Sequence, residues 1–177
     1  MKFDRTKLDP RVKRHMIVST LFTLALAFFI DHTYVNETDS LPKGWYYKTS
    51  SPIERGRIVT ACLSEKDTNF GLQRHYFFNG SECYGAAPIM KQVVAIPGDD
   101  VFLTKDFIAV NGKKFNLKTF QYDSRHRKLP HFQRGEYYPT EGYWLIGTNN
   151  PKSWDSRYFG PIHKSQILWV VTPVLTW

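Results

Sequence analysis

The first 35 residues combine a basic segment with an apolar run. Residues 16–30 (MIVSTLFTLALAFFI) carry no charge, and a helix of that length spans about 22 Å at about 1.5 Å per residue. This is short for a bilayer core of about 30 Å. Continuing to Val35 gives 20 residues, with Tyr34 at a depth suited to headgroups. We therefore expect a transmembrane anchor over residues 16–35.

The charge distribution supports this prediction. Residues 1–15 hold six Lys or Arg side chains against Asp4 and Asp9, a net +4 that is half of the formal net charge of +8. Basic residues next to an apolar run are typical of a cytoplasmic flank, and we prefer this interpretation to phosphate binding by a nucleic-acid-binding protein. Residues 1–15 are thus expected to form a cytoplasmic tail, and the chain from residue 36 to lie outside the cytoplasm.

Two alternatives for the apolar run stay open. A run of this length also occurs in buried helices of soluble proteins. The Ala25-Leu26-Ala27 sequence resembles a signal-peptide cleavage site. Cleavage there would leave Phe28 and Phe29 exposed at a new terminus, so we favour a retained anchor.

Residues 36–177 show short apolar or alternating runs separated by turns, and no amphipathic helix of convincing length. Asn111-Gly112 predicts a type I′ hairpin turn, and Pro97-Gly98 predicts another turn. This pattern predicts a mainly β domain, a barrel or sandwich, with a long polar surface loop over residues 118–141. The expected strands lie in residues 57–63, 92–96, 100–103, 107–110, 113–117, 142–146 and 166–174.

The composition excludes several classes of protein. Hydrophobic residues make up 42% of the chain and aromatic residues 16%, which is enough for a core and excludes wholesale disorder. Two cysteines cannot form a zinc ribbon, and the six histidines show no metal-ligand spacing. We expect neither a metal nor an organic cofactor. Outside the cytoplasm Cys62 and Cys83 would form a disulfide, the alternative being two unrelated buried thiols.

Two segments contain residues suited to catalysis. Ser40 lies in a stretch stiffened by Pro42 and Gly44, and Lys91 begins a largely apolar strand. Burial lowers the pKa of a lysine from about 10.4, and a neutral amine can take the proton from a serine hydroxyl. On their spacing alone, however, the two residues are better explained without catalysis, Ser40 as part of a turn and Lys91 as a charged surface residue.

Three motifs resemble those of the signal (leader) peptidase I family, which uses a serine–lysine dyad. They are Ser40-Leu-Pro-x-Gly, Lys91-x-Val-Val-Ala-x-Pro-Gly-Asp and Ser153-Trp-Asp155-Ser156-Arg157-Tyr-Phe-Gly-Pro, and they span residues 36–162. The short length and residues 38–46 and 83–91 most resemble the conjugative-transfer TraF-type peptidases. Those enzymes mature a pilin precursor, and some also join its ends into a ring.

The resemblance implies a role for each matching residue. Ser40 would be the nucleophile and Lys91 the general base. The backbone N–H of Ser40 and the hydroxyl of Thr38 would form the oxyanion hole, and Ser153 would orient the lysine. Asp155 and Arg157 would form a buried pair near the site, with Asp155 not in direct contact with the amine, because a close carboxylate raises a lysine pKa.

Two departures from the family pattern indicate a specialised branch. Gln92 follows the lysine where arginine is usual, and the segment that leads into the third motif has Gly147-Thr148-Asn149 where the family has Gly-Asp-Asn. We therefore expect a single-pass endopeptidase of the inner membrane with its catalytic domain in the periplasm. Its expected partners are a precursor peptide, a conjugative pilin above all, membrane lipid and the conjugative transfer machinery, with no nucleic acid.

Three alternatives stay open. Two keep the dyad: a general leader peptidase, or a self-cleaving regulator with similar Ser-Lys chemistry. The third is a non-catalytic, membrane-tethered β module of a secretion or transfer complex.

Overall fold

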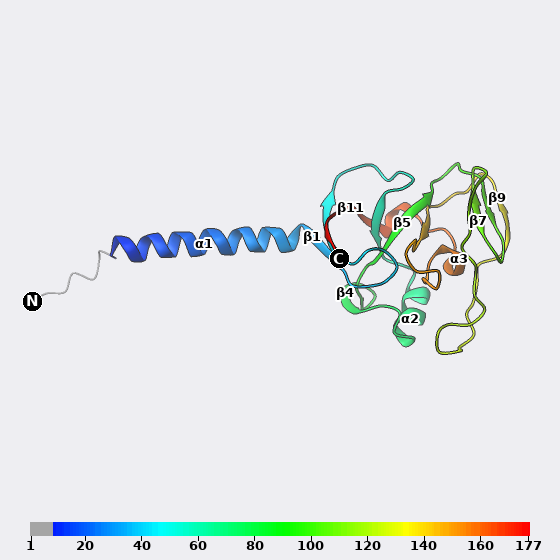
Figure 1. The fold of residues 1–177 in the computed structure, drawn as a ribbon, viewed down its shortest axis with the longest axis horizontal. Helices are drawn as coiled ribbons and strands as arrows, with labels where there is room; N and C mark the ends of the chain where they lie inside the picture. Colours follow the sequence, from blue (N-terminus) through cyan, green and yellow to red (C-terminus); the bar gives the residue numbers. More distant parts are fainter. Residues whose placement is uncertain (1–8) are drawn as a thin grey trace, which may run out of the picture. The chain divides into compact units, whose positions relative to one another are not determined.

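The computed structural model describes residues 9–177, which form parts of two compact units, Met1–Tyr34 and Val35–Trp177. Residues 1–8 of the predicted basic tail lie outside the described part. The first unit contains helix α1 (Pro10–Asp31), and the second contains the β domain (Figure 1).

Helix α1 begins earlier and ends earlier than the predicted anchor. The Asp9 side chain accepts a hydrogen bond from the Arg11 backbone N–H at 2.7 Å, and Pro10 occupies the first turn, where a missing N–H breaks no helical bond. The basic residues Arg11, Lys13 and Arg14 are therefore helical, whereas Thr33–Asn36 forms strand β1. Helix α1 has 22 residues and is long and apolar enough to cross a membrane, a test that a signal sequence also passes.

The second unit is built on two β-sheets. The larger has the order β1-β2-β11-β3-β5-β10 and the smaller the order β8-β7-β6-β9, with β7 and β9 on the other side of the unit from β11 (Figure 1). The further elements are β2 (Gly44–Thr49), β3 (Ile58–Ala61), α2 (Glu65–Gln73), β4 (Asn79–Cys83), β5 (Ile89–Ala95), β6 (Val101–Leu103), β7 (Ile108–Val110), β8 (Lys113–Phe115), β9 (Gly135–Tyr137), β10 (Trp144–Ile146), α3 (Ser156–Phe159), a 3-10 turn (Lys164–Gln166) and β11 (Ile167–Thr176).

The mainly β fold class is confirmed, and each of the seven predicted runs overlaps a strand. The hairpin turn is confirmed as well, because φ is positive at both Asn111 (48°) and Gly112 (79°) and Val110 pairs with Lys113 across it. Positive φ at both central residues defines the type I′ turn that joins tightly twisted strands.

Strand β5 lies between the two hydrophobic clusters of the domain. Successive side chains of a strand point to opposite faces, and Val93 belongs to one cluster while Val94 belongs to the other. Lys91 shares its face with Ile89 and Val93, both in the first cluster. A lysine at this position therefore enters the protein interior.

Two expectations about the β domain were wrong. Helix α2 is present although no helix was expected in the β domain. It begins after Ser64, whose side chain accepts a hydrogen bond from the Asp67 N–H. The helix has nine residues, mostly polar, which is too few to produce a recognisable pattern of apolar positions. The predicted surface loop over residues 118–141 contains strand β9 and buries Leu129. Asp123 anchors this loop by accepting a hydrogen bond from the hydroxyl of Tyr76 at 2.6 Å.

A disulfide joins Cys62 and Cys83, which are 21 residues apart, and so closes a loop that contains helix α2. A cross-link of this span restricts the unfolded chain and stabilises the folded state by about 3 kcal/mol in the chain-entropy model.

We predict that the double variant Cys62→Ser/Cys83→Ser loses about 3 kcal/mol of unfolding free energy relative to the oxidised protein. Urea titration measures the loss, and the reduced wild-type protein should show the same decrease. Two freely alkylated thiols without reductant, or an unchanged urea midpoint, would contradict the prediction.

Candidate active site

Ser40 lies in the irregular segment between β1 and β2 and is 9% exposed. Its backbone carbonyl accepts a hydrogen bond from the Asn149 N–H at 3.0 Å. At the end of the segment, Gly44 has a φ of 151°, and a Cβ there would meet the Leu175 carbonyl oxygen at 2.0 Å. The segment can therefore approach strand β11 closely only with glycine at this position.

Lys91 is the third residue of strand β5, which begins at Ile89 and not at the lysine as predicted, and Lys91 is 5% exposed. Its Nζ donates a hydrogen bond to Ser40 Oγ at 2.8 Å. The fold thus brings together two polar side chains that are 51 residues apart in sequence. A nucleophile and its base need a separation of about 2.6–3.2 Å, and this distance lies within that range.

Burial lowers the pKa of Lys91 from its ordinary value of 10.5 to about 8. The dominant cause is desolvation, which disfavours the ammonium form. The negative charge of Asp155 raises this pKa and the positive charge of Arg157 lowers it, so the two nearby charges oppose each other. A substantial fraction of Lys91 is therefore neutral near pH 8.

The hydroxyl of Ser153 lies 3.1 Å from Ser40 Oγ. Within residues 9–177 the structure shows a hydrogen bond between the hydroxyls of Ser153 and Ser40, and none between Ser153 and Lys91, which Ser153 was expected to orient. The lysine already donates to Ser40, so Ser40 can donate its own proton to Ser153 while the lysine is charged.

Gly147 is a contact residue that the sequence analysis treated only as part of a divergent motif. A Cβ at this position would lie 2.1 Å from Ser153 Oγ and 3.1 Å from Ser40 Cβ. Its backbone N–H donates to Asp155 Oδ2 at 3.1 Å. The two serines can approach each other only because residue 147 has no side chain.

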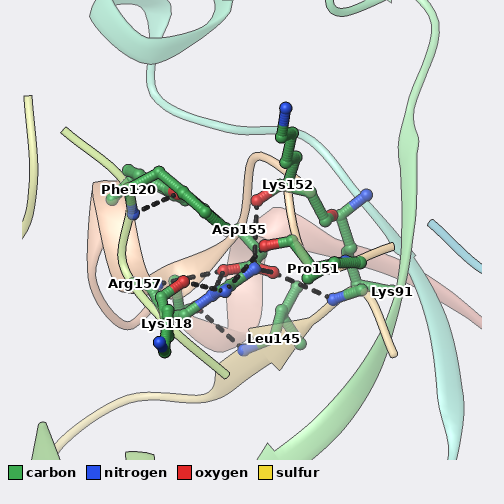
Figure 2. A network of polar contacts seen from close by, with 12 residues as sticks. Lys91, Lys118, Phe120, Leu145, Pro151, Lys152, Asp155 and Arg157 are labelled. Atoms are coloured by element: carbon green, nitrogen blue, oxygen red, sulfur yellow. Dashed lines mark hydrogen bonds and ion pairs between the residues drawn. The ribbon is translucent and has the colours of Figure 1, made fainter. Parts of the chain in front are cut away.

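Asp155 and Arg157 form a fully buried ion pair behind Ser153. Two parallel hydrogen bonds of 2.8 Å join the guanidinium to the carboxylate, the bidentate geometry that strengthens such a pair. The guanidinium also donates to the backbone carbonyls of Lys118, Pro151 and Ser153. Figure 2 shows this network, with Lys118 on one side of the ion pair and Lys91 on the other. The pair therefore anchors the turn that carries Ser153.

The predicted oxyanion donor Thr38 has its hydroxyl engaged elsewhere. Thr38 Oγ1 donates to Asn36 Oδ1 at 2.8 Å. Asn36 was not among the predicted site residues, although an asparagine two residues before a loop threonine is typical of an Asx turn. Among residues 9–177, no three His, Cys, Asp or Glu side chains are grouped as metal ligands.

Comparison with known proteins assigns this arrangement to a family. The family described as signal peptidase, peptidase S26, matches residues 11–175, which include every residue of the site. The chain belongs to this family. It is a family of serine peptidases.

Similar proteins of known name fall into two groups. Two plasmid transfer proteins TraF of Escherichia coli are 34% and 31% identical to this chain; the first alignment covers 87% of this chain and 89% of the relative, and the second 97% and 99%. Signal peptidase IB of Staphylococcus aureus (strain Mu50) is 31% identical over 69% of this chain and 60% of its own length. The chain is thus similar to TraF proteins over nearly its whole length.

We predict that Arg157→Met destabilises the domain by about 3–5 kcal/mol, because it leaves the buried Asp155 carboxylate without its cation. Chemical denaturation measures the loss. Adding Asp155→Asn should restore part of the stability, since it removes the unpaired charge. Equal stability of Arg157→Met and the wild type would show that the pair does not anchor the turn.

Proposed function

We propose that this chain is a membrane-anchored serine endopeptidase in which Ser40 is the nucleophile and Lys91 the general base. The observation that carries the proposal is the hydrogen bond of 2.8 Å between Lys91 Nζ and Ser40 Oγ, formed by an amine whose pKa burial lowers to about 8. A surface lysine would stay charged at neutral pH and could not accept a proton.

Acylation begins with the neutral form of Lys91. The amine takes the proton of the Ser40 hydroxyl while Oγ attacks the scissile carbonyl carbon. The backbone N–H of Ser40 and the hydroxyl of Thr38 would stabilise the resulting oxyanion, and for this the Thr38 hydroxyl must exchange Asn36 Oδ1 for the substrate oxygen. Lys91 then gives its proton to the leaving amine as the C–N bond breaks, which leaves an acyl-enzyme.

Deacylation repeats the same proton transfers with a second nucleophile. Lys91 is neutral again after protonating the leaving group, so it can deprotonate a water that attacks the ester carbonyl. The product is then linear. An amine of the same substrate chain in place of water would give a cyclic product. Neither step draws on a group other than those of the chain, the substrate and water.

The proposed location is the inner membrane, with the N-terminus in the cytoplasm and the β domain in the periplasm. Helix α1 is long enough to cross the bilayer, and the basic residues before the apolar run, three of them in the first turns of the helix, favour this orientation under the positive-inside rule. The disulfide between Cys62 and Cys83 suits an oxidising compartment. Anchoring would hold enzyme and substrate in one plane and so raise their effective concentration.

The proposed substrate is a membrane-translocated pilin precursor of a conjugative transfer system. The support is the similarity to plasmid transfer proteins TraF over nearly the whole chain. The similarity to signal peptidase IB favours a second candidate, general leader-peptide cleavage. Incubation of the full chain in detergent with a pilin precursor and, separately, with a secretory precursor distinguishes these two functions by mass spectrometry of the products.

We predict that Ser40→Ala and Lys91→Arg each lower the rate of precursor cleavage more than about 1000-fold. Arginine keeps the positive charge but cannot lose its proton, so this variant tests the base rather than the charge. The matched controls Ser50→Ala and Lys152→Ala change exposed residues and should retain the full rate. Full activity of either site variant, with a folded domain by circular dichroism, would contradict the dyad.

We predict that kcat/KM rises about tenfold per pH unit below pH 8 and levels off above it, because the neutral amine is the active form and the pKa of Lys91 is about 8. In Asp155→Asn the midpoint should move to lower pH, since the Asp155 charge raises the Lys91 pKa. The measurement is the rate profile from pH 6 to 10. A midpoint near the ordinary lysine value, or an alkaline move in Asp155→Asn, would contradict this assignment.

A further inference from the structure

One buried side chain organises the segment that carries Ser40. Asn36, the last residue of β1, is 3% exposed. Its Nδ2 lies 3.0 Å from each of the backbone carbonyl oxygens of Thr38, Leu41 and Pro42, and because the group has two protons, two of these acceptors share one. Its Oδ1 accepts from the Thr38 backbone N–H at 3.2 Å and from the Thr38 hydroxyl at 2.8 Å. A single carboxamide therefore contacts the chain both before and after Ser40.

These bonds replace regular secondary structure in the segment. Residues 37–43 belong to no helix or strand, yet a buried backbone carbonyl requires a partner. Asn36 supplies partners on both sides of Ser40, while the Ser40 carbonyl is bonded to the Asn149 N–H. The backbone that carries the nucleophile is thus restrained at three successive carbonyls, those of Ser40, Leu41 and Pro42.

We infer that Asn36 is a positioning residue for the peptidase reaction, an inference that rests on the proposed function. It sets the backbone geometry that directs Ser40 Oγ towards Lys91, and it orients the hydroxyl of Thr38. The role requires a donor and an acceptor on one short side chain. Aspartate lacks the donor, and glutamine places both groups one carbon further from the backbone.

The bond between Asn36 and Thr38 also suits a change of partner during catalysis. The Thr38 hydroxyl has one proton, and before substrate binds it donates that proton to the neutral Asn36 Oδ1. A developing oxyanion is a stronger acceptor than an amide oxygen, so the hydroxyl can turn to it. Asn36 Oδ1 keeps the Thr38 N–H as a partner, and no buried acceptor is left unpaired by the exchange.

The first test compares two asparagines that each restrain a turn. Asn111 accepts from the Asp100 N–H and donates to the Asp99 carboxylate, both at 2.9 Å, in the hairpin between β7 and β8. Asn36→Ala and the control Asn111→Ala should both lower the melting temperature. With the pilin precursor, kcat of Asn36→Ala should fall about 100-fold, as expected for a misplaced nucleophile, with KM nearly unchanged. Asn111→Ala should keep the wild-type kcat.

The second test measures the coupling of Asn36 to Thr38. If Asn36 supports catalysis partly by orienting the Thr38 hydroxyl, Asn36→Ala should lower kcat by a smaller factor in a Thr38→Val background than in the wild type. Equal factors in the two backgrounds would overturn the orienting role of Asn36.

A third measurement does not depend on activity. Hydrogen exchange at the Thr38 amide should become faster in Asn36→Ala and stay slow in Asn36→Asp, which keeps the acceptor. Unchanged exchange in Asn36→Ala, or equal kcat values for Asn36→Ala and Asn111→Ala, would overturn the inference. If the wild-type chain leaves the precursor intact while exchange changes as expected, the proposed function fails and the restraint of the segment by Asn36 stands.

Discussion

The removal of water from one amine is the constraint on which the site depends. Lys91 lies on the interior face of β5 with Ile89 and Val93, and its pKa of about 8 instead of 10.5 corresponds to about 3 kcal/mol against the charged form. That energy is a large fraction of the stability of a typical domain. The packing of strand β5, which is buried on both faces, offsets this energy. The lowered pKa of Lys91 is therefore a consequence of the hydrophobic core around it.

The groups around Lys91 preserve this effect instead of cancelling it. A lone carboxylate near the amine would raise its pKa and restore the charge. Both carboxylate oxygens of Asp155 instead accept hydrogen bonds from the guanidinium of Arg157. The positive charge of Arg157 therefore opposes the effect of Asp155 on the pKa of Lys91. The same guanidinium holds the turn that presents Ser153 to Ser40. One buried ion pair therefore serves both the electrostatics and the geometry of the site.

The segment around Ser40 differs from this rigid surrounding. It lacks regular secondary structure and obtains its order from the side chain of Asn36 and from Asn149. Side-chain hydrogen bonds can be exchanged one at a time, whereas a strand ladder cannot. This suits the proposed mechanism, in which the Thr38 hydroxyl changes its acceptor while Ser40 stays next to Lys91. An irregular backbone held by a few polar contacts would thus combine the fixed nucleophile and the movable donor that the proposal requires.

The sequence by itself determined the features that depend on residues close together along the chain. Alternating apolar runs predicted the mainly β domain, Asn111-Gly112 predicted its hairpin turn, and the uncharged run predicted helix α1, since each signal reflects local geometry. The family motifs identified Ser40, Lys91 and Ser153. Only the tertiary structure decided that Lys91 is buried, that Ser153 contacts Ser40, and that Gly147 makes room for both serines. It also showed the hydrogen bonds of Asn36. These features arise from contacts between segments far apart in sequence or from the hydrogen bonds of an irregular loop, and neither leaves a periodic pattern in the order of residues. Helix α2 escaped prediction for a different reason, because its nine residues are too few and too polar to form an apolar pattern.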